Sequence, residues 1–457
     1  MQTPESVNPA APNNPTSKKS SAYATRVSLI AALGGFLFGF ETAVISGAEL
    51  IIQKLWALDS NLQGFTVASS LGGTVIGSII ASVPAQKYGR KKILIVIAIL
   101  YLVSAIGCAL TYTWALFVVF RFIGGIAVGA SSVVGPTYIS EVAPPKIRGR
   151  LAGSFQLMIV TGIFVAYLTN FLFADFGDSG WRWMLGIMIV PALLFLILLR
   201  FIPESPRWLV LNYRDAEAAV IFEKTGETAA GALIREEHLL SVKGTKERLF
   251  SGKFNKPILY AVLLAMFNQL SGINAILYYA PRIFEMAGFD KADSYLQPVF
   301  IGFFNLLFTI LAMTMIDKFG RKKLLLIGSA GMIVFLALTA YAFSSGGGNQ
   351  LVIVYLIGFI GFFGFSQGAV IWVFISEIFP NSIRSKGMSL GSFTHWIMAF
   401  IISWTFPLVV ENIPNGGVYA FIFYSVMMLI ALVFIWKVMP ETKGRSLEQI
   451  QKELGIE

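Results

Sequence analysis

Charged residues and cysteine are both scarce in this sequence. Only 13% of the 457 residues are charged, whereas a soluble domain has about 25%, and this excludes an ordinary soluble domain. The single cysteine, Cys108, excludes an intrachain disulfide. We find no paired catalytic carboxylates, no nucleophile motif and no metal-ligand spacing, so we expect neither an enzyme nor a metal site nor a bound cofactor.

Long apolar runs make up most of the chain, and 56% of its residues are hydrophobic. Many runs are long enough for a helix to cross about 30 Å of hydrocarbon. The runs are continuous, whereas the strands of a membrane β-barrel alternate with a period of two. The sequence therefore predicts an all-α membrane protein with twelve transmembrane helices, near residues 26–48, 63–85, 92–112, 114–138, 149–174, 182–202, 256–286, 295–316, 323–344, 350–376, 386–410 and 417–438.

Basic residues are concentrated in alternate short loops, although the net charge of the whole chain is +10. KYGRKK, PPKIRGR, KFGRKK, NSIRSK and the tail after Lys437 lie on one side, while DFGDSG and FDKADS, on the other, are acidic or nearly neutral. Lys and Arg in short loops mark the cytoplasmic side. We therefore expect both termini in the cytoplasm, and the topology explains the positive charge without a nucleic-acid partner.

Three loop sequences of the first half return in the second half. KYGRKK at 87–92 returns as KFGRKK at 318–323, SEVAPPKIRGR at 140–150 as SEIFPNSIRSK at 376–386, and IPESPR at 202–207 as MPETKGR at 439–445. The offsets of 231, 236 and 237 residues indicate duplication of a six-helix unit. Because six is even, both copies enter the membrane from the same side and form parallel repeats.

The duplication also predicts the domain organisation. We expect a disordered cytoplasmic tail over 1–22, six-helix bundles over 23–203 and 254–439, a cytoplasmic linker over 204–253 and a cytoplasmic tail over 440–457. The linker has two stretches with the pattern of short amphipathic helices, before and after residue 230, and His238 there is expected at the surface. Two such halves around a central site are the architecture of an alternating-access transporter. The alternative is a twelve-span scaffold without a transport role.

The repeated loop motifs resemble those of the sugar porter family of the major facilitator superfamily. The resemblance covers roughly residues 25–445 and rests on GR[KR] after the second and eighth spans, E-x(6)-R after the fourth and tenth, PESPR after the sixth and PETKG after the twelfth. The chain is similar to bacterial proton-linked xylose and glucose symporters and to animal glucose facilitators. The resemblance implies the major facilitator fold and a monosaccharide substrate.

Charged residues in these loops lead to the hypothesis of a latch between the halves on the cytoplasmic side. Glu141 with Arg148, and Glu377 with Arg384, place an acid at a helix end and a base seven residues later. Such pairs would break for inward opening; the alternative is solvated charges that only set topology. Further members are Arg90 and Arg321, whose guanidinium groups can bridge carboxylates, and, as the resemblance implies, Glu204, Arg207, Asp317 and Glu441. Gln86 replaces the Asp that is usual in the family, which would weaken the first-half latch.

Polar residues within spans indicate a substrate path. A sugar needs amides and hydroxyls that donate and accept hydrogen bonds, together with aromatic faces. The seventh span supplies both in NQLSGINAILYYAP, where Asn268, Gln269, Asn274 and Tyr278 can share a face, allowing for an interruption at Ser271-Gly272. Interhelical hydrogen bonding is the alternative role for any single amide.

The resemblance adds residues from other spans to this site. It implies sugar contacts for Gln156, Gln269, Asn274, Asn305 and Trp372, and aromatic lining or closing positions for Phe38, Tyr278, Tyr279 and Trp396. The chain departs from the family at Asn268, where a second Gln is usual, at His395, where Gln or Asn is more common, and after Gly368, where Ala369 replaces a proline. His395 can contact the sugar, carry a proton or tie two helices together.

Glu41 lies well inside the first apolar run, where an unpaired charge costs at least about 2.5–3.5 kcal/mol. It stands roughly 22 Å along its helix from the cytoplasmic side, and Arg121 of the fourth span roughly 10 Å from the outer side. In a core about 30 Å thick the two depths nearly coincide, so we expect an ion pair. The pair is either structural or coupled to transport. The resemblance favours coupling, because proton symporters of this family carry an acid, usually Asp, at this position.

The expectation from sequence is therefore a proton-coupled monosaccharide symporter that works by alternating access, with the proton as coupling ion. Its partners would be a small sugar, the proton and the lipid bilayer, with no nucleic acid, and the protein is expected to be a monomer in a bacterial inner membrane. The alternatives are a sugar uniporter with a structural Glu41–Arg121 pair, a sugar receptor on a transporter fold, and an exporter of drugs or polyols. Short tails argue against the receptor.

Overall fold

The computed structural model describes residues 15–227, 234, 247–345, 350–380, 382–445 and 447–456, with the side chains of 15–19, 315–318, 447 and 448 excepted. The first half consists of α1 (Pro15–Leu55), α2 (Ser60–Ile80), α3 (Ser82–Tyr88), α4 (Arg90–Leu110), α5 (Trp114–Val142), α6 (Arg148–Phe173), η1 (Gly177–Ser179), α7 (Gly180–Gly186), α8 (Ile189–Leu198) and η2 (Leu199–Phe201). Two short helices follow, α9 (Pro206–Leu211) and α10 (Asp215–Thr225).

The second half repeats this plan with more interrupted helices. It consists of α12 (Asn255–Leu270), α13 (Ile273–Tyr278), α14 (Ala280–Met286), α15 (Lys291–Phe319), α16 (Arg321–Ser344), α17 (Leu351–Phe365), α18 (Gln367–Ile378), α19 (Arg384–Asn412), α20 (Gly416–Lys437) and α21 (Leu447–Leu454).

The predicted twelve spans are present. Among the described residues, eleven helical segments are long and apolar enough to cross a membrane, and the pair α2–α3, bent by 46°, forms the twelfth. The bend has a local cause in Pro84 of α3. Proline has no backbone N–H, so Pro84 cannot donate the hydrogen bond that would join it to the Ile80 carbonyl in a continuous helix.

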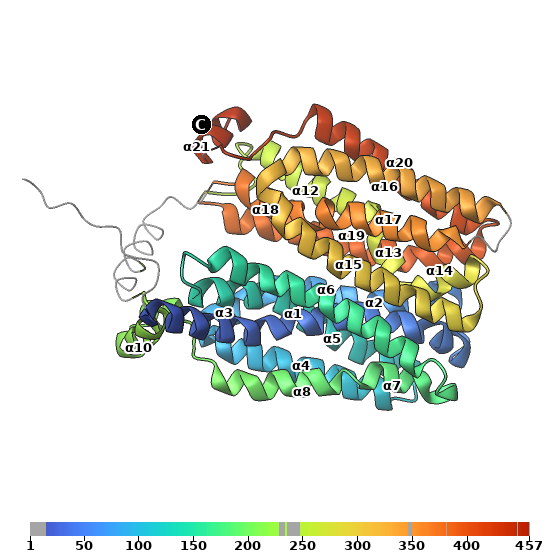
Figure 1. Ribbon diagram of the computed structural model, residues 1–457, viewed down its shortest axis with the longest axis horizontal. Helices are drawn as coiled ribbons and strands as arrows, with labels where there is room; N and C mark the ends of the chain where they lie inside the picture. Colours follow the sequence, from blue (N-terminus) through green and yellow to red (C-terminus); the bar gives the residue numbers. More distant parts are fainter. Residues whose placement is uncertain are drawn as a thin grey trace, which may run out of the picture.

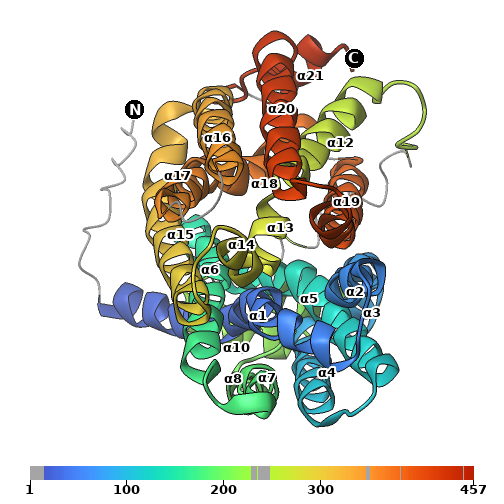
Figure 2. The same cartoon turned by 90° about the vertical axis from the view of Figure 1, so that its right-hand side faces the viewer.

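The two halves form two layers. Figure 1 shows the first half below and the second above, with α3, α10 and α21 near the left-hand end, and Figure 2 looks onto the other end. The halves contact each other where α2 lies beside α19, α6 beside α15, and α1 beside α13 and α14. We call the end that carries α3, α10 and α21 the basic end, because the repeated basic loops lie there, and the other the opposite end.

Glycines bring the helices of the first half into close contact. A Cβ atom on Gly39 of α1 would lie 1.8 Å from the carbonyl oxygen of Ile159 in α6, and one on Gly125 of α5 would lie 1.8 Å from that of Ser70 in α2. Small residues at such crossings let backbones approach in a membrane bundle. The tight crossings fix α1 and α5, which carry Glu41 and Arg121.

The ends of the chain differ in part from the expectation. Residues 15–22 belong to α1, so the disordered tail expected over 1–22 is wrong for these residues; they extend the helix toward α10, where Lys224 lies over the ring of Tyr23 at 5.8 Å. α10 confirms the first amphipathic helix of the linker, whereas the second, with His238, lies outside the described residues. In α21 and just after it, Ile450, Leu454 and Ile456 are buried against the second half.

Candidate functional site

The predicted ion pair is present in the middle of the first half. Arg121 Nη1 donates to Glu41 Oε1, and both residues are almost wholly buried, with exposed fractions of 1% and 4%. The depth comparison therefore paired the correct helices. The hydroxyl of Ser70 in α2 lies beside the Glu41 carboxylate. Because a buried unpaired charge is costly, either partner alone would be strongly unfavourable here.

Four polar side chains of the expected sugar site contact one another. Gln269 Nε2 donates to Asn268 Oδ1 over 2.9 Å, and Asn274 Nδ2 donates to Gln269 Oε1 over 2.8 Å. Gln269 Nε2 also lies 3.1 Å from Nε2 of His395 on α19. Asn268 turns partly away, because its Nδ2 donates to the Gln367 carbonyl over 3.2 Å. The cluster joins α12, α13 and α19 at one point.

Aromatic rings extend this cluster to the first half. The ring of His395 lies 4.9 Å from Trp372 of α18 and 4.8 Å from Trp396, measured between centroids. Trp396 in turn lies 5.6 Å from Phe38 of α1. Phe38 is three residues from Glu41, so one turn of α1 carries both an aromatic contact of the sugar cluster and the buried acid.

The remaining expected sugar contacts are placed less closely. Asn305 is buried in α15, Gln156 is exposed on α6, and Gly368 lies in the first turn of α18. The side chains of Asn305 and Gln156 make no hydrogen bond to the cluster within the described residues. Their role as sugar contacts stays a prediction.

Two spans of the second half are broken beside the cluster. α12 ends at Leu270 and α13 begins at Ile273, with Gly272 between them at a φ of +83°, a value that favours glycine. The expected interruption at Ser271-Gly272 is confirmed. α17 and α18 are separated at Ser366, so the tenth span breaks even though Ala369 stands where the family has proline.

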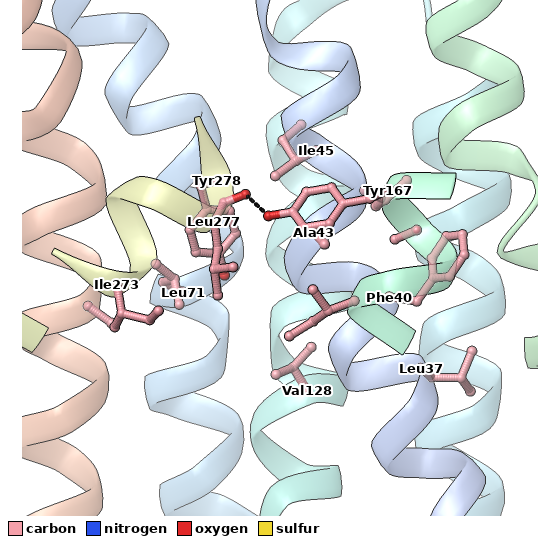
Figure 3. Close-up of a cluster of buried hydrophobic side chains, with 14 of the residues drawn as sticks. Leu37, Phe40, Ala43, Ile45, Leu71, Val128, Tyr167, Ile273, Leu277 and Tyr278 are labelled. Carbon is pink, nitrogen blue, oxygen red and sulfur yellow. Dashed lines mark hydrogen bonds between the residues drawn. The ribbon is translucent and has the colours of Figure 1, made fainter. Parts of the chain in front are cut away.

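At the opposite end, hydrogen bonds join the two halves. Tyr167 of α6 donates to the Leu277 carbonyl over 2.7 Å, and Figure 3 shows its ring among Ile45, Ala43 and Tyr278. Tyr295 of α15 donates to the Gly47 carbonyl over 2.7 Å. Tyr278 is buried, and Tyr279 is held within the second half, where its hydroxyl donates to the Ser403 carbonyl over 2.8 Å.

A charged cluster at the same end was not expected from the sequence. Arg282 of α14 donates through Nε to Glu49 Oε1 over 2.9 Å and through Nη2 to Glu49 Oε2 over 2.7 Å, a two-point contact between the halves. Arg282 also pairs with Glu411 of α19, and Glu49 accepts from Gln63 Nε2 over 2.6 Å. Glu49 is 0% exposed. The sequence signal for this cluster is the presence of an acid, Glu49, and a base, Arg282, in the outer parts of the first and seventh spans.

At the basic end, the charged residues form two matching clusters, one in each half. In the first, Arg90 pairs with Glu141 over 2.8 Å, and Ser205 Oγ donates to Glu141 over 2.6 Å. In the second, Arg321 pairs with Glu377 over 2.9 Å, and Thr442 Oγ1 donates to Glu377 over 2.6 Å. The same geometry at equivalent positions is the structural counterpart of the loop repeat.

The glycine of each GRK motif fits beneath an acid of the same cluster. Gly89 and Gly320 have φ of +99° and +86°, and a Cβ atom there would lie 2.3 Å from Glu204 and 2.9 Å from Glu441 respectively. Glu441 accepts from backbone N–H groups of Arg321 and Lys322, each over 3.0 Å. Burial by itself raises the pKa of Glu441, but these donors and those of Thr442 and Lys443 together lower that pKa below its ordinary value.

The Arg90–Glu141 and Arg321–Glu377 ion pairs of the basic end each lie within one half, so a latch between the halves stays a prediction for another conformation. Arg148, expected opposite Glu141, donates from Nε to the Ala143 carbonyl over 3.3 Å, and Glu141 binds Arg90 instead. Arg384 lies beside Glu377 in the pocket between α18, α19 and the chain after α20. Arg207 is exposed on α9, and the side chain of Asp317 lies outside the described residues.

Comparison with known families decides the identity of this arrangement. The model of the family described as "Sugar (and other) transporter" matches residues 27–454. The chain belongs to this family. It is therefore a multi-pass membrane transporter of the major facilitator type, and its family is one of transporters rather than enzymes.

Several members of the sugar transporter family are similar over nearly their whole length. The arabinose-proton symporter of Bacillus subtilis (strain 168) is 36% identical over 454 residues, which is 96% of this chain and 97% of the relative. The glucose transport protein of Synechocystis sp. is 38% identical over 470 residues, covering 96% and 100%. The D-xylose-proton symporter of Escherichia coli (strain K12) is 36% identical over 473 residues, covering 94% and 96%.

Solved structures of the same family have the same fold. The inward open conformation of the xylose transporter XylE from Escherichia coli matches with a TM-score of 0.84 at 34% sequence identity, covering 94% of this chain and 100% of that one. Its partially occluded inward open conformation matches with a TM-score of 0.83 at 34% identity, covering 93% and 100%.

The amide cluster of this sugar transporter leads to a binding prediction. We expect Gln269→Ala and Asn274→Ala each to weaken sugar binding by about 1–2 kcal/mol, or roughly 5- to 30-fold in Kd, because each removes a hydrogen-bonding group from a buried polar site. Calorimetric titration of the purified transporter with its transported sugar measures this. Asn212→Ala, at the residue after the distant α9, is the control. Unchanged affinity in both site variants would remove the seventh span from the site.

The Arg282 cluster leads to a conformational prediction. Glu49→Gln removes the charge that joins Arg282 to the other half, and a charged hydrogen bond contributes about 1.5–3 kcal/mol. We therefore expect the equilibrium to shift roughly 10- to 150-fold toward opening at this end. Spin labels at Leu62 and Ile413, in a background with Cys108→Ser, report the distance across the interface.

Glu285→Gln is the matched control for that measurement, because Glu285 is an exposed acid on the same helix as Arg282. The exchanged pair Glu49→Arg with Arg282→Glu should restore part of the closed population. A Glu49→Gln distance distribution identical to that of the unmodified protein contradicts a closing role for the cluster.

Proposed function

We propose that this protein is a proton-coupled monosaccharide symporter of a bacterial cell membrane, working by alternating access. The observation that carries the proposal is the buried Glu41–Arg121 pair, one helical turn from the aromatic and amide cluster between the halves. Relatives named as arabinose-proton and D-xylose-proton symporters support it. A pentose or hexose is the expected substrate, and the proton is the coupling ion.

The charge distribution supports one orientation in the membrane. The basic end carries the repeated Lys- and Arg-rich loops, so it faces the cytoplasm together with both termini. The opposite end, closed by Tyr167, Tyr295 and the Arg282 cluster, then faces outward. The conformation described here is the inward-facing one, in agreement with the resemblance to inward open XylE.

Sugar recognition would combine two kinds of contact. Gln269, Asn274 and His395 offer donors and acceptors to sugar hydroxyls, and Trp372 with Trp396 covers the apolar face of the ring. The amides already bond to one another, which orients them. Each amide has further donor and acceptor sites for a ligand with many hydroxyls.

Coupling follows from the charge on Glu41. Protonation neutralises the carboxyl and removes its attraction for Arg121, so the free energy of the pair depends on the proton. Since α1 also carries Phe38, which contacts Trp396, and Glu49, which contacts Arg282, a small shift of α1 reaches both the sugar cluster and the outer closure. The proton thereby biases the balance between the two conformations.

This coupling is tested by substituting the acid. We expect Glu41→Gln to abolish uphill sugar accumulation in proteoliposomes with a pH gradient while leaving sugar counterflow within about threefold of the unmodified protein, because exchange needs no net proton movement. The sugar is first chosen by comparing radiolabelled xylose, glucose, galactose, fructose and inositol. Gln156→Ala serves as a control for general loss of uptake without loss of coupling.

The alternative of a uniporter with a structural pair makes the contrary prediction. In that case Glu41→Gln lowers protein stability and counterflow together, and the unmodified protein never accumulates sugar above the outside concentration. Uphill accumulation that persists in Glu41→Gln means that Glu41 is not the coupling group.

A further inference from the structure

Five buried polar atoms, beside the Glu41–Arg121 pair or between it and the basic end, have no hydrogen-bond partner among the described residues. They are Nε and Nη2 of Arg121, the hydroxyl oxygens of Ser104 and Ser131, and that of Tyr101. These four residues are at most 1% exposed. Native proteins rarely leave buried polar groups unsatisfied, because each such group loses its hydrogen bonds to water, and a bound water is then the usual partner.

The unpartnered hydroxyls adjoin the acid and one another. A Cβ atom on Gly124 would lie 2.4 Å from Ser104 Oγ and 2.9 Å from Glu41 Oε1, so the hydroxyl and the carboxylate occupy the space over the same glycine. The hydroxyl of Tyr101, one turn along α4 from Ser104, faces that of Ser131 on α5. Ser131 Oγ in turn lies against Gly34 of α1. The polar groups thus lead from Glu41 through α4 to α5.

This polar series runs toward the basic end. Arg121 and Ser131 are ten residues apart on α5, a rise of about 15 Å. The spacing of Arg121, Gly124, Ser131 and Tyr138 keeps them on one face of the helix. Tyr138 reaches the basic end, where its hydroxyl donates to the carbonyl of Pro203 over 2.8 Å, next to Glu204.

The other direction is closed by aromatic rings. Phe117, one turn from Arg121 toward the opposite end, packs against Trp56 at 5.3 Å and Trp181 at 6.0 Å between centroids, and Trp56 lies 5.8 Å from Trp181. Phe117 and Trp181 are fully buried. A route for the proton from Glu41 through the sugar cluster is also closed, since the acid is only 4% exposed in this inward-facing conformation.

We propose that these hydroxyls, with water molecules bound among them, carry the proton from Glu41 to the cytoplasmic side inside the first half, apart from the path of the sugar. The proposal rests on the proton-coupled function above. The O–H bond of protonated Glu41 breaks and its proton passes to a neighbouring water, which releases another proton onward, so each hydroxyl keeps one hydrogen throughout. The carboxylate left behind pairs with Arg121 again. Tyr101 and Ser131 are positioning residues in this step.

The test separates proton transfer from sugar movement. Tyr101→Phe and Ser131→Ala each remove one hydroxyl with little change of volume. In proteoliposomes, we expect the initial rate of sugar uptake driven by a pH gradient to fall at least about fivefold, while the rate of counterflow exchange stays unchanged. We also expect D₂O to slow the uptake driven by the pH gradient by a larger factor than in the unmodified protein. Rates that depend on a proton path respond in this way, whereas a packing defect lowers both rates alike.

Ser132→Ala is the matched control. Ser132 is the next residue on α5, and its hydroxyl already donates to the Gly129 carbonyl over 2.7 Å, so this variant should keep the unmodified ratio of the two rates. If Tyr101→Phe and Ser131→Ala both keep that ratio while the unmodified protein accumulates sugar, the proposed route is wrong and the coupling proposal stands. If the unmodified protein itself shows no accumulation with a pH gradient, the proton-coupled function fails first and the route falls with it.

Discussion

The buried contact between Glu41 and Arg121 is the interaction on which the rest of the structure depends. Two charges in the interior of a membrane bundle are tolerated only as a pair, and here the surrounding helices are arranged for that pair. Gly39 and Gly125 bring α1, α2, α5 and α6 together, and Gly124 leaves room for the carboxylate. In the proposed mechanism, a first half built so tightly moves as a unit, so that a change of charge at Glu41 leads to movement between the halves.

The duplicated clusters at the basic end explain why each half remains rigid. Arg90 and Glu141 in one half, and Arg321 and Glu377 in the other, tie the ends of three helices together, and the acids Glu204 and Glu441 hold the chain that leaves each bundle. These bonds do not cross between halves. Polar contacts that do cross, such as Arg282 with Glu49 and Tyr167 with Leu277, lie at the other end. Two halves that are joined by ion pairs and hydrogen bonds at one end suit an alternating-access movement.

Sequence reasoning predicted the features that depend on local pattern. The spans follow from apolar length, the break at Ser271-Gly272 from residue type, and the Glu41–Arg121 pair from depth along two helices. It failed where the partner depends on tertiary packing. Arg282 meets Glu49 and Glu411 only because this conformation brings α14 to α1. Glu141 meets Arg90 rather than Arg148 because α4 and α5 are neighbours within the first half. Residues 15–22 were also misjudged, since their polar composition hid a helix, which is followed by the contact of Tyr23 with Lys224 of α10.

Glu41 lies between two different environments, and in the proposed mechanism this position separates the proton from the sugar. On one side α1 presents Phe38 to the aromatic cluster of the second half, and on the other Glu41 faces Arg121 and the hydroxyls of the first half. A sugar that entered the carboxylate site would need its own space there, and the close helix crossings leave none. In the proposed mechanism the two solutes are therefore linked only through α1, and a helix that both of them move is sufficient to couple their transport.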